Sequence, residues 1–297
     1  MILLTGATGL VGTALLSRLT KEAEPVRCLV RDPRRLGVER VRVQIALGDL
    51  TDPQSFRHAL RGVSTVVHLA ASIRDQGPPG AGRSIEELNG VATWRLVQAA
   101  ERAGVQRFVF FSALGASTRS RARFMRAKAL AERAVGESPI PHTVFAPSIV
   151  YSPGDPFLKL LERLSLLPAV PISGRGRAPF QPIWVEDVAD CVHAALAAPD
   201  RLRERYELAG PDTLSYRAIV ELAVRATGRR RALVPVPLRF AERALGAAEA
   251  VAGRPVLATP DELELMEVPM VSRLGTADAE SLGVRPRAMP GVLGAAA

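Results

Sequence analysis

Three glycines near the start of the chain constrain its fold more than any other feature. Gly6, Gly9 and Gly12 follow an apolar run at 2–4 and precede apolar residues at helical spacing. A short apolar run without helical periodicity is typical of a strand buried on both faces. The order strand, glycine turn, helix is the context in which a G-x-x-G-x-x-G pattern binds a dinucleotide. In such a turn Gly6 permits the tight bend, Gly9 leaves space for a pyrophosphate and Gly12 brings the helix close to the strand.

This turn supplies the first predicted cofactor-binding residues. The backbone N–H groups at a helix N-terminus have no partner within the helix, and they attract phosphate together with the helix dipole. The residues expected to contact the dinucleotide are Gly6, Thr8, Gly9, Leu10, Val11 and Gly12. The alternative is a strand–helix turn that binds no ligand.

The end of the second predicted strand, at 26–30, bears on the choice of cofactor. In an NAD site an acidic residue commonly lies at this position and accepts a hydrogen bond from the ribose 2′-hydroxyl. Here Arg31 comes first, with Arg34 and Arg35 close behind. A guanidinium group suits a 2′-phosphate, so we predict NADP(H) in preference to NAD(H). The alternative is that these arginines face water and that Asp32 binds the ribose of NAD(H).

Strands and helices alternate through the first half of the chain. This order predicts an α/β fold with a Rossmann doubly wound parallel sheet. Further strands are expected at 41–47, 65–69, 106–111 and 143–146, and helices from Pro53, at 84–104 and at 121–136.

The pattern loosens after residue 147, where proline and glycine recur. We predict an NAD(P)-binding Rossmann domain over 1–150, with later strands returning from about 180–210. Residues 151–297 are expected to form mainly a smaller C-terminal substrate lobe. Its expected elements are helices at 157–167, 184–198, 215–227 and 241–252 and a strand at 206–209.

The residues after the third and fourth strands add to the predicted cofactor site. Asp49 and Leu50 follow the third strand, where Asp49 is placed to accept a hydrogen bond from an adenine amine. Ala70 and Ala71 follow the fourth strand and leave room for a ribose. His68, just before them, is expected to be a packed strand histidine rather than a catalyst. The turn-rich loop at 74–83 is a candidate cover for the site.

The charge of the chain limits its partners. The net charge is +9 and arises almost entirely from arginines scattered along the sequence. Such a balance points to nucleic acid, an anionic membrane surface or an anionic ligand. No nucleic-acid motif accompanies the arginines, and aromatic residues make up only 5%. We therefore expect a solvated basic surface and no nucleic-acid partner.

Cysteine usage and apolar runs indicate the compartment. Cys28 and Cys191 are the only cysteines, which predicts neither a disulfide framework nor a metal site. No apolar run reaches the ~18 residues that cross a bilayer, and the first strand begins at residue 2, which argues against a leader. We expect a cytoplasmic protein, either free or peripheral at the inner face of the cell membrane. Arginines 229–231 are the candidate lipid contact, whereas core packing is expected for the alanine-rich helix at 241–252.

Seven sequence blocks resemble those of the extended or atypical short-chain dehydrogenase/reductases, and they occur in the same order with the same spacing. That family includes proteins similar to NAD(P)-dependent epimerases and dehydratases. The blocks are TGATGLVG at 5–12, GDL at 48–50, HLAA at 68–71, LNG at 88–90, RFVFFS at 107–112, PSIVY at 147–151 and QPIWVED at 181–187. The tail segments at 259–266 and 282–286 resemble one NmrA-like branch, that of the nucleotide-binding accessory subunit of respiratory complex I and its bacterial relatives.

The resemblance implies a catalytic set of Asn, Ser, Tyr and Lys. Asn89, Ser112 and Lys128 match three of them, but Phe124 stands at the tyrosine position. In the family, Tyr and Lys lie four residues apart on one helix face. The Lys binds the nicotinamide ribose and lowers the pKa of the Tyr, which moves the proton that accompanies hydride transfer. The resemblance also adds Lys128, Pro147 and Ile149 to the expected cofactor-binding residues.

Phenylalanine has no proton to transfer, and general acid–base catalysis contributes roughly 10²–10⁴-fold. We therefore predict an NADP(H)-binding protein with weak or no catalysis. Its expected role is redox sensing or assembly, with a membrane-associated respiratory complex or quinone-linked system as partner.

Two alternatives remain open. In the first, the protein is an active oxidoreductase that reduces a quinone, a carbonyl or another small hydrophobic substrate, with its proton from water, Ser112 or Tyr151. In the second, it is a scaffold whose nucleotide site is vestigial.

Overall fold

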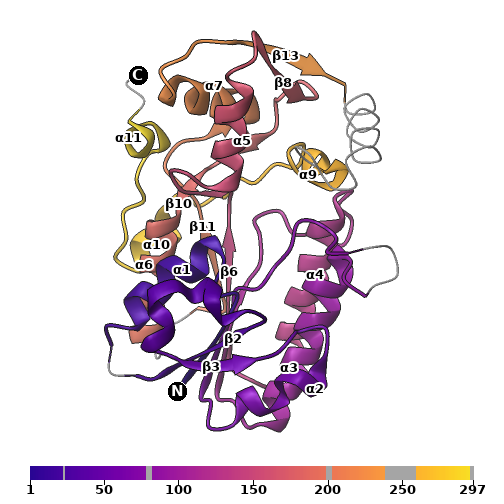
Figure 1. Cartoon of the computed structure of the whole chain (residues 1–297), viewed down its shortest axis with the longest axis vertical. Coiled ribbons are helices and arrows are strands. Elements are labelled where there is room, and N and C mark those ends of the chain that lie inside the picture. Colours follow the sequence, from indigo (N-terminus) through magenta and orange to yellow (C-terminus); the bar gives the residue numbers. More distant parts are fainter. Residues whose placement is uncertain (23, 78–81, 199–202, 238–258, 295–297) are drawn as a thin grey trace.

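Seven parallel strands form the central sheet of the computed structural model, which describes residues 1–22, 24–77, 82–198, 203–237 and 259–294 (Figure 1). The order across the sheet is β11-β6-β5-β4-β1-β2-β3, and every neighbouring pair is parallel. The strands are β1 (Ile2–Thr5), β2 (Val26–Val30), β3 (Gln44–Leu47), β4 (Thr65–His68), β5 (Arg107–Phe111), β6 (His142–Pro147) and β11 (Arg205–Leu208). The predicted doubly wound parallel sheet is confirmed.

The strand order reverses at β1, which pairs with β2 on one side and β4 on the other. All four residues of β1 are buried, as the apolar run at 2–4 predicted. In open α/β sheets the crevice beyond the carboxyl ends of the strands at such a reversal is the usual ligand site. The topology therefore places the glycine turn, which follows β1, at the ligand-binding edge of the sheet.

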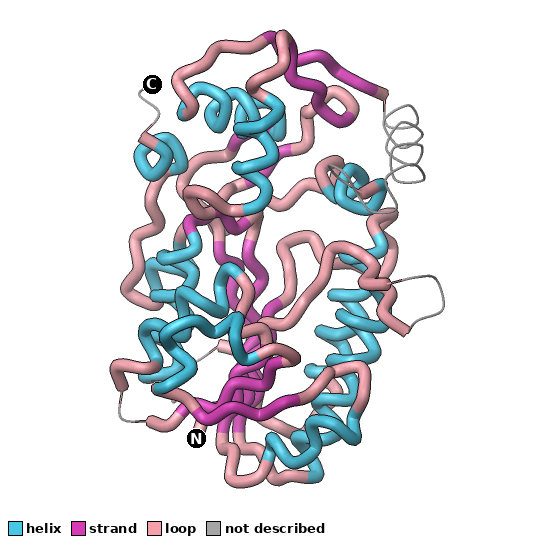
Figure 2. The backbone as a smooth tube through the Cα atoms, viewed as in Figure 1, coloured by secondary structure: helices cyan, strands magenta, loops and turns pink. Residues whose placement is uncertain are grey.

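Helices cover both faces of the sheet, as the tube in Figure 2 shows. On one face α1 (Leu10–Leu19) packs against α6 (Val185–Ala197) and a core that includes Leu15 and Val188. The other face is covered by α2 (Pro53–Phe56), α3 (Ala92–Arg102) and α4 (Arg123–Gly136), around Phe56 and Leu96. Burial on both faces explains why these strands are predominantly apolar.

Two predicted elements differ from the structure. The third strand begins at Gln44 rather than 41, because residues Pro33–Val41 form the short helix η1, which is interrupted at Gly37 with φ of 59°. In the helix expected at 84–104, residues Glu87–Val91 form the π-helical turn η3 before α3 begins. A further short helix, η2 (Arg57–Leu60), extends α2.

The C-terminal half returns one strand to the sheet and builds a second core. Beside β11 and α6, this half contains β7 (Val150–Tyr151), α5 (Pro156–Leu164), β8 (Ala169–Ser173), β9 (Pro179–Phe180), β10 (Ile183–Trp184), β12 (Leu214–Ser215), α7 (Tyr216–Ala226), β13 (Ala232–Val236), α9 (Pro260–Leu265), α10 (Ala277–Ser281) and α11 (Met289–Leu293). The second core includes Tyr151, Phe180 and Ile219. Figure 1 shows α5, α7, β8 and β13 at the end of the molecule away from α2 and α3. The helix predicted at 241–252 lies outside the described residues.

The two cysteines are buried and free, one on β2 and one on α6. Within the described ranges, no helix combines the length and the apolar character that crossing a bilayer requires.

Candidate functional site

The turn after β1 has a geometry that requires glycine at two positions. Gly6 has φ of +72°, and a Cβ on it would lie 2.5 Å from the backbone nitrogen of Ala70. A Cβ on Gly12 would lie 2.1 Å from the carbonyl oxygen of Gly6. Gly9 precedes α1, and its N–H donates to the carbonyl of Gly6 at 2.9 Å. The turn, the end of β4 and the start of α1 are therefore held in backbone contact.

A cleft of about 370 Å³ lies along this turn and the carboxyl ends of β2 and β4. Of the predicted cofactor-binding residues, its wall includes Gly6, Thr8, Gly9, Arg31, Asp49, Leu50, Ala70 and Ala71. Its wall also contains Arg35 and Asp32, which the sequence offered for the adenosine ribose and its phosphate. The other lining residues had no predicted role: Ala7, Leu29, Val30, Gly48, Leu69, Ser72, Gln76 and Leu88. The predicted residues Leu10, Val11, Gly12, Lys128, Pro147 and Ile149 do not line this cleft.

The end of β2 presents basic groups to the cleft. Arg31 and Arg35 both line it, and Arg31 donates to Oε1 of Gln76 at 2.9 Å. Asp32 instead caps the N-terminus of η1, because its Oδ1 accepts a hydrogen bond from the backbone N–H of Arg34 at 3.0 Å. The polar groups here are two guanidinium donors and one carboxylate acceptor, of which one oxygen is already engaged at the start of η1.

Asp49 also lines the cleft and is ionised. Its carboxylate accepts two hydrogen bonds from Thr51, at 2.9 and 3.0 Å, and pairs with Arg83 at 2.9 Å. Partial burial raises the pKa of this carboxyl, but the Thr51 hydrogen bonds and the charges of Arg83 and Arg31 outweigh that effect and lower it. Arg83 and Gln76 come from the ends of the loop at 74–83, so the described parts of this loop contact both Asp49 and Arg31.

His68 is a structural residue, as predicted. Its side chain is fully buried, with Nδ1 2.6 Å from the Thr5 hydroxyl and Nε2 2.9 Å from the Thr93 hydroxyl. Burial, helped by the charge of Lys128, lowers the pKa of His68 to about 3. The imidazole is therefore neutral and holds β1, β4 and α3 together.

Lys128 on α4 is buried beside aromatic rings. Its Nζ donates to the carbonyl of Phe111 at 2.6 Å and lies 4.9 Å from the centre of the Phe110 ring and 5.7 Å from that of Phe124. Burial lowers the pKa of Lys128 to about 7. Phe124, one helical turn earlier, offers no hydroxyl to this ammonium group.

Ser112 follows the last residue of β5, Phe111, whose carbonyl accepts the hydrogen bond from Lys128. Its backbone N–H donates to Phe145, but its buried hydroxyl has no hydrogen-bond partner among the described residues. The hydroxyl of Tyr151 is also buried without a partner in the same described set, and burial raises its pKa. An unpaired buried hydroxyl costs about 1–3 kcal/mol, which a ligand that hydrogen-bonds to it would recover.

Asn89 is engaged by the backbone. Its Nδ2 donates to the carbonyls of Ser72 and Ile85, each at 2.7 Å, and its Oδ1 accepts from the N–H of Ser72 at 3.1 Å. Both amide protons are used within the protein. In this arrangement Asn89 positions Ser72, which lies on the cleft wall.

Comparisons with known proteins agree with this geometry. Residues 6–199 match the model of the family described as NAD(P)H-binding. The chain is 31% identical over 254 residues to the (4-alkanoyl-5-oxo-2,5-dihydrofuran-3-yl)methyl phosphate reductase of Streptomyces griseus, which covers 84% of this chain and 79% of the relative. It is 26% identical over 295 residues to the mitochondrial NADH dehydrogenase [ubiquinone] 1 alpha subcomplex subunit 9 of Rattus norvegicus, which covers 95% of this chain and 75% of the relative.

A solved structure shows the same fold. The NADPH-dependent quinone oxidoreductase of Escherichia coli, crystallised with NADPH, superposes with a TM-score of 0.75 over 99% of both chains at 16% identity. The glycine turn, the cleft and the family match lead to one assignment. The chain belongs to the NAD(P)H-binding family, as an atypical short-chain dehydrogenase/reductase whose relatives include the complex I accessory subunit.

Proposed function

We propose that this protein binds NADP(H) tightly and catalyses hydride transfer weakly or not at all. The observation that carries the proposal is Phe124, whose ring centre lies 5.7 Å from Nζ of Lys128. The family has its proton-transferring tyrosine at this position. The glycine turn and the cleft that would bind a dinucleotide are present, whereas position 124 has no hydroxyl that could transfer a proton.

The residues of the cleft have distinct tasks in this proposal. The N–H groups of the turn at 6–12 bind the pyrophosphate, and Ala70 and Ala71 leave room for a ribose. Arg31 and Arg35 bind the 2′-phosphate, since guanidinium groups bind phosphate with paired, charge-assisted hydrogen bonds. Asp49 and Leu50 bind the adenine.

Lys128, Pro147 and Ile149 bind the nicotinamide half, and residues 151–297 contribute mainly the substrate lobe. The preference for NADP(H) over NAD(H) is supported by Asp32, whose carboxylate caps η1.

NADPH, when bound, supplies a hydride. The Ser112 hydroxyl is the group placed to donate a hydrogen bond to a substrate carbonyl, because no described residue occupies it. Lys128 binds the ribose and holds the Phe111 carbonyl in place. Phe124 excludes water from the ammonium group but provides no proton.

The biological role that we propose is redox sensing or assembly beside a membrane-associated respiratory or quinone-linked complex. The support is the similarity over 95% of this chain to a protein named as a subunit of NADH dehydrogenase. The proposed location is the cytoplasm, with peripheral association at the inner face of the membrane.

A second candidate function is an active NADPH-dependent reductase of quinones or carbonyls. The unpartnered Ser112 hydroxyl favours it, as does the 31% identity to the (4-alkanoyl-5-oxo-2,5-dihydrofuran-3-yl)methyl phosphate reductase of Streptomyces griseus. A quinone needs hydride delivery more than a positioned tyrosine, because its product oxygens can take protons from water.

One experiment separates these functions. Any nucleotide that copurifies is released and identified, NADPH and NADH are titrated by calorimetry, and the loaded protein is assayed with quinones and carbonyls. Tight NADPH binding with turnover near the uncatalysed rate supports the first function. Robust turnover that Ser112→Ala and Lys128→Ala abolish supports the reductase. Failure to bind either nucleotide overturns both and leaves a scaffold with a vestigial site.

A further inference from the structure

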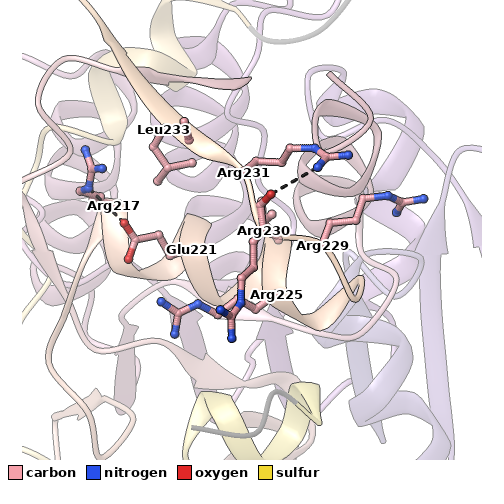
Figure 3. Close-up of a pocket in the computed structure, with 9 residues that line it drawn as sticks. Arg217, Glu221, Arg225, Arg229, Arg230, Arg231 and Leu233 are labelled. Atoms are coloured by element: carbon pink, nitrogen blue, oxygen red, sulfur yellow. Dashed lines mark hydrogen bonds and ion pairs between the residues drawn. The ribbon is translucent and has the colours of Figure 1, made fainter. Parts of the chain in front are cut away.

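The end of the molecule formed by α5, α7, β8 and β13 carries a concentration of arginines. Arg217 and Arg225 on α7 line a pocket of about 370 Å³ together with Arg229, Arg230 and Arg231, which follow the helix (Figure 3). A second pocket, of about 490 Å³, shares Arg217 and adds two more arginines, Arg175 and Arg177. Two adjoining hollows are thus lined mainly by guanidinium groups.

These charges have little compensation within the protein. The one acidic residue in either wall is Glu221, which points to Arg217 and pairs with it at 3.1 Å (Figure 3). Across the described ranges, no carboxylate lies within 4.0 Å of the other six arginines. The dipole of α7 accounts for a basic residue in its last turn, such as Arg225, but its effect fades beyond that turn. It therefore does not explain Arg230, Arg175 or Arg177.

Exposed apolar side chains lie next to the arginines. Leu166 and Leu167 form the turn after α5 and are 65% and 46% exposed. Arg231 donates from Nε to the carbonyl of Ser165 at 2.9 Å, which places its guanidinium group beside this turn. Val234 on β13 is 47% exposed. The same end of the molecule therefore combines uncompensated cations with leucines that face water.

We propose that this arginine–leucine surface, defined by Leu166, Leu167, Arg225, Arg229, Arg230 and Arg231, docks on an anionic phospholipid bilayer. Guanidinium groups pair with lipid phosphates, and the leucines enter the boundary between head groups and acyl chains. A binding site for a soluble phosphate would enclose its arginines, but Arg225, Arg230 and Arg231 are exposed. The adjacent leucines favour a bilayer over an acidic protein, because exposed leucines gain free energy by leaving water and add nothing to a purely electrostatic contact.

The test is sedimentation of the full-length, nucleotide-loaded protein with vesicles. Vesicles of phosphatidylcholine alone are compared with vesicles that also contain phosphatidylglycerol. We expect binding only to the anionic vesicles, and we expect it to weaken as salt is added. Arg225→Ala/Arg230→Ala should lower the partition coefficient by about 25-fold, or roughly fivefold for each arginine removed. Leu166→Ala should weaken binding severalfold at constant charge.

Matched controls lie at the other end of the molecule. Arg57→Ala/Arg102→Ala removes the same charge from exposed positions near α2 and α3, and Leu130→Ala truncates a leucine that is 52% exposed on α4. Both controls should bind vesicles as the wild type does. All variants should retain the wild-type melting temperature and NADPH affinity.

Three results would overturn the proposal. The first is equal loss in the two double-arginine variants, which would make binding a matter of net charge. The second is tight binding of soluble glycerol phosphate that competes with vesicles, which would indicate a small-ligand pocket. The third is binding to polyglutamate but not to anionic vesicles, which would indicate an acidic protein partner. None of these outcomes depends on whether the protein turns over a substrate.

Discussion

The Nζ atom of Lys128 lies 5.7 Å from the centre of the Phe124 ring, and its hydrogen bond goes to the main-chain carbonyl of Phe111. The two residues are one turn apart on α4, so a tyrosine at 124 would bring its hydroxyl to the same side of the helix as the ammonium group. In the function that we propose, this pair occupies the position of a proton-transfer site but lacks the hydroxyl that would transfer the proton.

Restoring that atom should restore catalysis. We expect Phe124→Tyr to raise kcat/KM for NADPH-dependent carbonyl reduction by about 10²–10⁴-fold, the usual contribution of a positioned acid. The measurement is initial rates of NADPH oxidation over a panel of ketones and quinones. Phe124→Leu is the control and should leave the rate unchanged. A wild-type rate already equal to that of Phe124→Tyr would show that the missing hydroxyl is not limiting.

Arg31 should decide nucleotide preference. In the proposed site, replacing Arg31 with alanine would remove a charge-assisted hydrogen bond to the 2′-phosphate, and such bonds contribute about 1.5–3 kcal/mol. We expect Arg31→Ala to weaken NADPH binding roughly 10- to 100-fold and to leave NADH binding unchanged, as measured by calorimetry. Arg34→Ala, next to the site but outside the cleft wall, should change neither affinity. An equal loss for both nucleotides would assign Arg31 to the part of the cofactor that they share.

Gly12 should tolerate no side chain. A Cβ there would lie 2.1 Å from the Gly6 carbonyl oxygen and 2.8 Å from Ala7 Cα, both backbone atoms. We expect Gly12→Ala to reduce the free energy of unfolding by about 1–3 kcal/mol, as overpacked cores do, and to abolish nucleotide binding. Chemical denaturation and calorimetry measure the two effects.

Gly136 provides the matched control, because a Cβ at the end of α4 would meet nothing within 4 Å. Gly136→Ala should keep or raise the free energy of unfolding. A Gly12→Ala protein as stable as this control would mean that α1 can move away from β1 without cost.

Lys128 should make stability depend on pH in a defined window. In the unfolded chain a lysine keeps its proton up to its ordinary pKa of 10.5, whereas burial lowers the pKa of Lys128 to about 7 in the folded protein. Between these values the unfolded state binds more protons, so stability rises with pH. Below pH 7 both states are protonated and the cost of the buried charge is complete.

We therefore expect Lys128→Met, relative to wild type, to be most favourable below pH 7 and to lose that advantage progressively toward about pH 10. Denaturant titrations of both nucleotide-free proteins across this range give the difference. A difference that stays constant with pH would show that the folded-state pKa of Lys128 is near its ordinary value.

Some of this protein was readable from local patterns. The strand at Ile2–Thr5, the glycine turn and the helix at Leu10–Leu19 follow each other in the sequence. Their order and their apolar spacing can be recognised from residues 2–19 alone. The alternation of strands and helices then dictates a parallel sheet, because parallel neighbours need a crossover and the crossover has one hand. The absence of tyrosine at position 124 is likewise a fact of sequence.

Contacts between residues far apart in the sequence could be known only from the tertiary structure. Gln76 and Arg83 reach Arg31 and Asp49 from a loop whose sequence indicated turns but not these partners. Asn89 donates both of its amide protons to the carbonyls of Ser72 and Ile85. The third strand begins late because the preceding segment forms η1 under the cap of Asp32.

The arginine–leucine surface was predicted only in part, because the sequence offered arginines 229–231 as a lipid contact but did not place them beside Leu166 and Leu167. The hydrogen bond from Arg231 to the carbonyl of Ser165 brings together segments 66 residues apart. Periodicity and spacing determine the elements and the order of their connections. Which side chains meet beyond the sheet edge that the strand order predicts, and which are left without a partner, depends on how those elements pack, because such contacts join residues far apart in the sequence.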